Sequence, residues 1–342
     1  MNSVSIVATG MVTGVGLDAP SSCAAIRCAI DRFQETRFRD RNGEWIIGSE
    51  VPLSPPSRGR EKILRLAAAA IAECVAAVPD VAAREIPLVL CVAEQTRAGR
   101  FEGLDQSLLG EIGQQLKMAV HGRSAVIVKG RVGGVEAIAR ASEMIRVGAP
   151  YSIVAGVDTF LVAPTLAFYE KKNRLLTSKN SNGFIPGEAA GALLIGPAGG
   201  GESVELRCLG IGFGQEKATI ESEEPVRADG LVAALRAAMG DAGCGFEDVD
   251  YRLTDSNGEQ YAFKEASLAL ARTVRVPKAD FDIWHPADCI GEVGAATVPC
   301  ALAVADAAAR KLYAPGPGVL AHFGNDSGER AAMVLRYSDH GA

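Results

Sequence analysis

Histidine is scarce in this chain of 342 residues: there are four, and one of them, His340, stands in the C-terminal tail. The eight cysteines are scattered, no two form a CxxC pair, and most have apolar neighbours. Zinc sites and disulfide frameworks need paired or clustered ligands at short spacings. We therefore expect small buried thiols, no metal site and no cofactor.

A surplus of positive charge and a long apolar run are also missing. The net charge is −6 and the isoelectric point is near 5.4, whereas nucleic-acid binding needs clustered Lys and Arg. No stretch approaches the roughly 20 apolar residues that cross a bilayer, and no basic start leads into an apolar segment. We expect a cytoplasmic protein that has neither nucleic acid nor membrane as a partner.

The chain does have a core-forming composition, with 48% hydrophobic and 22% charged residues. Its length exceeds that of one simple small domain. Hydrophobic patterns alternate between strand and helix, which indicates a parallel or mixed sheet covered by helices. The first half predicts strands at 4–8, 88–92, 124–128, 152–156 and 190–195, and helices at 20–30, 60–77 and 133–146.

A stretch rich in proline and glycine at 197–202 then interrupts the pattern, which restarts in the same order. The second half predicts strands at 204–211, 249–253 and 331–335, and helices at 229–239, 261–271 and 295–312. This repetition favours a duplicated α/β unit with an N-terminal half, 1–197, and a C-terminal half, 203–342.

The most informative segment is the strand 124–128 with the turn around Arg131 and the helix that follows. A strand, a turn of small residues and a helix form the arrangement that presents a reactive side chain at a helix N-terminus, where the dipole favours an anion such as a thiolate. Arginine stays protonated and has no lone pair for attack. Covalent catalysis by residue 131 is therefore excluded.

Four stretches resemble the thiolase-fold β-ketoacyl synthases, the condensing enzymes of fatty-acid and polyketide assembly. They are the opening VATGMVTGVG at 7–16, the segment 133–158, the sequence GFIPGEAAGA at 183–192, and IGEVGAA at 290–296. The third stretch is similar to the family's GFxxGEGAG segment. The resemblance implies a five-layer αβαβα fold with mixed sheets, and a dimer that forms through the strand 124–128.

The same resemblance implies that the family's Cys-His-His triad is missing. The acyl-accepting cysteine falls on Arg131, the first histidine falls in 254–259 near Asp255, and the second is replaced by Glu292 after Gly291. The family's glycine-rich gating loop is replaced by residues 323–329. Polyketide chain-length factors, the partners of type II ketosynthases, also lack the cysteine and share the Gly-Gly pair seen at 133–134.

We therefore expect a catalytically inactive, ketosynthase-like pseudoenzyme that acts as a scaffold, adaptor or partner subunit. The partners that the resemblance implies are a second copy, a ketosynthase, an acyl carrier protein or a component of a bacterial secretion system. The alternative is an acyl-thioester-processing or acyl-binding subunit, which uses a relocated nucleophile or works with an active ketosynthase.

Arg131 at a helix N-terminus faces an unfavourable dipole and should have a carboxylate beside it. Glu292 and Asp255 are the candidates for a buried pair that fills the vacated cavity. Alternatively, Arg131 points elsewhere and larger side chains close the cavity, or it captures an anionic ligand.

Cys289 is the candidate for a relocated nucleophile, because His285 stands four residues before it. An inert buried thiol beside a satisfied histidine is the simpler interpretation. The basic residues Lys171, Lys172 and Arg174 are expected on the solvated surface, with the docking of an acidic carrier protein at Lys171 and Lys172 as the alternative.

Overall fold

The computed structural model describes residues 4–199, 204–275, 277–278 and 280–338. In its N-terminal part the elements are β1 (Val4–Val12), α1 (Ala19–Arg27), β2 (Gln34–Arg39), β3 (Trp45–Gly48), α2 (Gly59–Ala76), β4 (Leu88–Cys91), α3 (Leu108–Gln115), β5 (Ala125–Ile127), α4 (Gly133–Arg146), β6 (Ser152–Thr159), α5 (Ala163–Lys171) and β7 (Glu188–Pro197). The C-terminal part consists of β8 (Glu205–Gln215), α6 (Asp229–Ala242), β9 (Tyr251–Thr254), α7 (Gln260–Thr273), β10 (Ile283–Trp284), α8 (Ala287–Ile290), α9 (Thr297–Arg310), β11 (Gly318–Gly324) and β12 (Glu329–Ser338).

Within the described residues, one mixed sheet takes the strand order β10-β9-β11-β12-β8-β1-β7-β6-β4-β5. Its middle is the antiparallel pair β1 and β8, in which Val4 lies opposite Cys208. Outward from this pair, each half repeats one pattern: an antiparallel strand (β7 or β12) comes first, and three mutually parallel strands follow it (β6, β4 and β5, or β11, β9 and β10). The two halves are therefore one α/β unit used twice.

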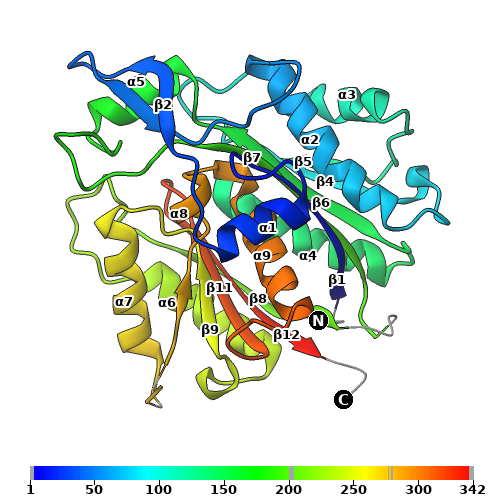
Figure 1. Cartoon of the computed structure of the whole chain (residues 1–342). Helices are drawn as coiled ribbons and strands as arrows, with labels where there is room; N and C mark the ends of the chain where they lie inside the picture. The colour runs from blue at the N-terminus through cyan, green and yellow to red at the C-terminus, as the bar shows by residue number, and fades with distance from the viewer. Residues whose placement is uncertain (1–3, 200–203, 276, 279, 339–342) are drawn as a thin grey trace.

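The helices form three layers around the two halves of the sheet (Figure 1). On one outer face α2 packs on β1, β6 and β7 and also contacts α3, while on the other α6 packs on β8 and β12 and contacts α7. Between the two half-sheets lie α4 and α9, which contact each other. The five-layer αβαβα fold expected from the sequence is confirmed. In the part of the chain described, no helix has both the length and the apolar character needed to span a membrane.

Most elements lie where their hydrophobic pattern predicts them, and α4 has the expected bounds. Gly148, just past its end, adopts the expected left-handed conformation with φ of +98°. The sequence analysis missed the short or irregular elements, which are β2, β3, α3, α5, β10 and α8, and also β11. The expected boundary at 197–202 lies partly outside the described residues, so the division into two domains remains a prediction.

The central layer allows α4 and α9 to approach closely because small residues line their contact. A Cβ atom at Gly134 would lie 2.5 Å from Cβ of Val298 on α9, closer than any real contact. Val298 is fully buried and has no space to withdraw. The position of α4, and hence of the turn before it, therefore depends on this glycine.

We predict that Gly134→Ala lowers the free energy of unfolding by about 1–3 kcal/mol, the usual cost of overpacking a core. Urea denaturation measures it. Gly240→Ala is the matched control, since this helical glycine has nothing within 4 Å of its added Cβ. It should be neutral or stabilise by up to about 1 kcal/mol. Equal effects of the two substitutions would contradict the packing argument.

Candidate functional site

Arg131 lies at the junction that the sequence indicated, between β5 and α4. A single 3-10 turn, Gly130–Val132, connects the two and continues directly into the helix. Gly130 takes a φ of +50°, and a Cβ there would collide with the carboxylate of Glu94. The Arg131 side chain is 14% exposed and points from the N-terminal half toward residues of the C-terminal half.

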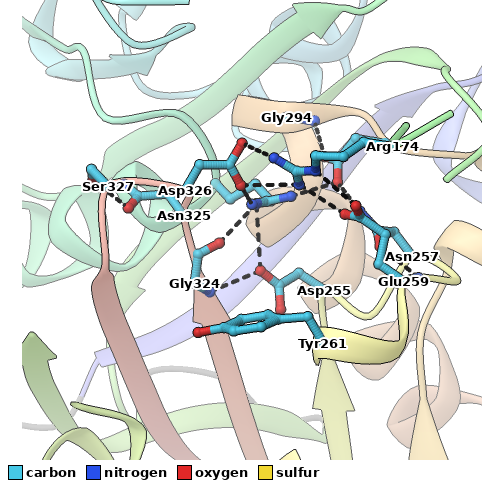
Figure 2. Close-up of polar contacts among 12 residues, drawn as sticks. Arg174, Asp255, Asn257, Glu259, Tyr261, Gly294, Gly324, Asn325, Asp326 and Ser327 are labelled. Carbon is cyan, nitrogen blue, oxygen red and sulfur yellow. Dashed lines mark hydrogen bonds and ion pairs between the residues drawn. The ribbon is translucent and has the colours of Figure 1, made fainter. Parts of the chain in front are cut away.

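The guanidinium of Arg131 uses all three of its nitrogens on groups from the C-terminal half. Its Nη1 donates to Oε2 of Glu292 at 2.7 Å, and its Nη2 donates to Oδ1 of Asp326 at 2.8 Å. Its Nε donates to the carbonyl oxygen of Gly324 at 2.7 Å and lies 3.6 Å from Oδ2 of Asp255. The expected pair of Arg131 with Glu292 therefore forms, and Asp255 stands close by as a weaker partner. Figure 2 labels three of these partners, Asp255, Gly324 and Asp326.

Among Arg131 and its three carboxylate neighbours, Glu292 is the most deeply buried, with 2% of its side chain exposed. Besides Arg131, it accepts hydrogen bonds from Nδ2 of Asn257 at 2.7 Å and from the backbone N–H of Gly294 at 2.9 Å. Burial acts to raise the pKa of Glu292, but Arg131 and these donors outweigh it and hold the pKa below its ordinary value. Glu292 is thus a fixed anion.

In Asp255, burial outweighs the effects that lower the pKa. Burial raises the pKa of its carboxyl above the ordinary value, and the opposing effects of Arg131 and of the backbone N–H of Gly324, 2.8 Å away, only partly offset it. The two carboxyl groups that stand where the resemblance places the histidines therefore have pKa values shifted in opposite directions. Glu292 supplies the main charge for Arg131, and Asp255 supports the turn at Gly324.

A second arginine joins the cluster, and it corrects an expectation. Arg174 was expected on the surface, yet it is 6% exposed. It forms a two-pronged pair with Glu259, with contacts of 2.7 and 2.8 Å, and donates from Nη1 to Oδ2 of Asp326 at 2.7 Å. Asp326 thus bridges Arg131 and Arg174, which hold its pKa well below the ordinary range although burial acts to raise it (Figure 2).

Two further buried arginines stand at the edges of this cluster. Arg97 donates from Nη1 to Oδ2 of Asp158 at 2.9 Å, and Asp158 also accepts the backbone N–H of Ala295. On the other side, Nε of Arg330 lies 2.9 Å from both carboxylate oxygens of Glu265. The sequence analysis did not single out these pairs. Among the partners of Arg131 it also missed Asp326, although this residue lies in the segment 323–329 that it marked as unusual.

Little space remains beside Arg131. The cavity there has a volume of about 50 Å³, and its walls include Arg131, Arg174, Glu259 and Asp326. One water needs at least about 10–15 Å³ by this measure, so the space suits a few waters. Seven ionic side chains, among them Arg131, Arg174, Glu259 and Asp326, contribute to its walls, and placing an acyl chain among such charges is unfavourable.

Cys289 does not belong to this site, because it lines a different cavity, between α1, β10 and α8. Burial raises the pKa of the Cys289 thiol to about 11, and the charges of Asp288 and Asp31 add to this effect. The imidazole of His285 is engaged instead with Asp288, whose Oδ2 lies 2.9 Å from its Nδ1. A thiol in this setting is a poor nucleophile at neutral pH. Among the described residues no group of His, Cys, Asp and Glu could hold a metal ion.

Solved structures with the same architecture include ketosynthases and chain length factors. One chain comes from a type II polyketide acyl-carrier protein in complex with its ketosynthase bound to a hexaketide. It covers 98% of this chain and 99% of its own length with a TM-score of 0.81 and 14% identity. The ishigamide ketosynthase/chain length factor gives a TM-score of 0.76 with 16% identity, over 98% of this chain and 99% of that one. The protein has the thiolase-like ketosynthase fold.

Two further comparisons bear on this relationship. A ketosynthase in complex with its chain length factor from Xenorhabdus doucetiae gives a TM-score of 0.74 at 14% identity and covers 98% of both chains. In sequence, the chain is 27% identical over 158 residues to the "Actinorhodin polyketide putative beta-ketoacyl synthase 2" of Streptomyces coelicolor. That match spans 42% of this chain and 38% of the Streptomyces protein. No known family profile matches the chain.

We predict that Arg131→Ala costs about 3–5 kcal/mol of unfolding free energy, because it strands the buried Glu292 carboxylate. Chemical denaturation of the purified variant measures it. Arg146→Ala is the control: its pair with Glu143 is more than half exposed and should contribute less than about 1 kcal/mol. A loss below about 1 kcal/mol for Arg131→Ala would show that the cluster does not depend on this residue.

His322 on β11 also lines the cavity beside Arg131 and is 5% exposed. Burial, with the charges of Arg252 and Arg330, lowers its pKa from 6.5 to about 3. The unfolded chain therefore binds the extra proton first, and stability falls as the pH drops below 6.5 toward 3.

We predict that wild type loses about 1 kcal/mol per pH unit relative to His322→Gln between pH 6 and pH 4. Denaturation curves of both proteins at each pH measure this difference. The contributions of the carboxylates, which both proteins share, cancel in the comparison. Parallel pH profiles of the two proteins would show that His322 is not buried in its neutral form.

Proposed function

We propose that this protein is a non-catalytic, ketosynthase-like subunit that works through assembly with a partner. The observation that carries the proposal is Arg131, a permanent cation at the N-terminus of α4, bound to Glu292 and Asp326 at 2.7 and 2.8 Å. A condensing enzyme needs an electron-rich nucleophile at the corresponding turn. Here the group offers only donors, and each of its nitrogens already has an acceptor.

The surrounding charges also oppose condensation chemistry. Forming a carbon–carbon bond from a thioester passes through an anionic oxygen, which needs hydrogen-bond donors aimed at it. Glu292, Glu259 and Asp326 present acceptor oxygens, and the nearby guanidinium donors are already bound to them. An anionic intermediate placed here would be repelled and would find few free donors.

The partner part of the proposal rests on β5. This three-residue strand is the last in the sheet order, next to β4, so its other side has no neighbour in the described chain. Unpaired backbone groups at a sheet edge are available for another strand. The solved structures that this chain resembles include a ketosynthase with its chain length factor and a ketosynthase with an acyl-carrier protein. We propose a ketosynthase-type partner, or a second copy of this chain, at β5.

Intact-mass measurement after incubation with acyl thioesters tests the non-catalytic part. We expect no acyl adduct on Cys28→Ser protein, a background that removes the exposed thiol of Cys28. An active ketosynthase treated in the same way supplies the positive control. An adduct that forms on the Cys28→Ser protein and disappears when Cys289 is also replaced by serine would establish a relocated nucleophile. That result would overturn the proposal.

Size-exclusion chromatography with light scattering tests the proposed assembly with a partner separately, because it measures the mass of the complex. We expect a complex with a ketosynthase, or a homodimer, that Val126→Pro in β5 weakens while the fold is kept. A protein that stays monomeric alone and in the presence of ketosynthases would remove this part and leave the non-catalytic part standing.

A further inference from the structure

A second cavity lies between α1, β10, α8 and the end of α9, and it shares no lining residue with the cavity beside Arg131. Its volume is about 330 Å³, within the range of roughly 300–1,000 Å³ that is usual for small-molecule sites. Ile26, Ala29, Ile283, Trp284, Pro286, Cys289, Val304 and Tyr313 supply most of its walls. It is several times larger than the space beside Arg131.

Two aromatic rings give this cavity a preference for a flat apolar group. The rings of Trp284 and Tyr313 are 24° from parallel, with their centroids 6.4 Å apart. Trp284 is fixed from behind by the ring of Tyr251, 4.6 Å away between centroids. Flat faces held this way contact an aromatic or alicyclic ligand at little entropic cost.

The charged groups of the wall favour an anion. Arg27 and Asp288 are the charged side chains of the wall, and Oδ2 of Asp288 lies 2.9 Å from Nδ1 of His285, which also lines the cavity. Arg27 lies over the Tyr313 ring at 4.1 Å and makes no ion pair with any residue that the structure describes. The exposed guanidinium of Arg27 thus has donors available for a ligand carboxylate.

We infer that this cavity is a binding site for a small aromatic carboxylate, with its ring against Trp284 and Tyr313 and its carboxylate on Arg27. Arginine suits this task because its planar fork binds a carboxylate while it stacks on an aromatic ring. Cys289 contributes an uncharged wall and takes no covalent part. The site is independent of the proposed function, since it shares no residue with the cluster around Arg131.

Trp284 provides the signal for a direct test. The chain has two tryptophans, so Trp45→Phe leaves Trp284 as the single emitter. We expect a saturable change in its fluorescence on titration with 4-phenylbutyrate, and weaker binding of the neutral 4-phenylbutanamide. Arg27→Gln in this background should weaken the acid by about two- to fivefold, as for a partly exposed ion pair, and leave the amide unchanged.

Two more variants complete the design. Val304→Phe fills the cavity from α9 and should abolish the signal for both probes, with circular dichroism as the check that the protein folds. Arg236→Gln on α6 removes an arginine of another surface and should change nothing.

The inference fails if 4-phenylbutyrate gives no saturable change up to about 10 mM, which is weaker than any specific small-ligand site. It also fails if acid and amide bind equally, or if Arg27→Gln and Arg236→Gln behave alike. If Val304→Phe does not fold, the comparison of acid and amide on Arg27→Gln still decides.

Discussion

The structure around the nucleophile turn depends on the burial of a single charge, the guanidinium of Arg131. A cation at the N-terminus of α4 is opposed by the helix dipole and by the loss of water, and one exposed carboxylate would not compensate for both. Glu292, Asp326 and the carbonyl of Gly324 all come from the C-terminal half and meet the cation with short hydrogen bonds. Arg131 therefore ties the two halves together at the turn between β5 and α4.

A buried pair of this kind fixes geometry more than it adds stability, because desolvation consumes most of the Coulomb energy. The pair does hold the two side chains in one arrangement, because separating or removing either partner leaves a buried charge uncompensated. Asp326 extends this constraint to Arg174 and through it to Glu259. The network therefore connects the turn before α4, the loop between β11 and β12, and the segment before α7. Replacing Arg131 alone would remove a partner from both Glu292 and Asp326.

Sequence reasoning located the turn at Arg131 because a strand, small residues and a helix follow each other within a few positions there. It also identified Glu292, through the short IGEVGAA stretch. It could not find Arg174 or Asp326 as partners, because neither is apolar nor periodic, and their burial depends on contacts over 152 positions in the chain. The strands β2, β3 and β10 were missed for a related reason: they are short, and tertiary pairing rather than local pattern makes them strands.

The contrast between the two cavities follows from the same electrostatics. Around Arg131, buried arginines and carboxylates bind one another, and the cavity that remains beside them has room for only a few waters. Between α1 and α9 most of the walls are apolar, Arg27 has no ion pair among the residues described, and the cavity is larger. Charges that bind each other leave little room for a ligand, while an unpaired arginine beside aromatic rings leaves a site that a ligand can complete.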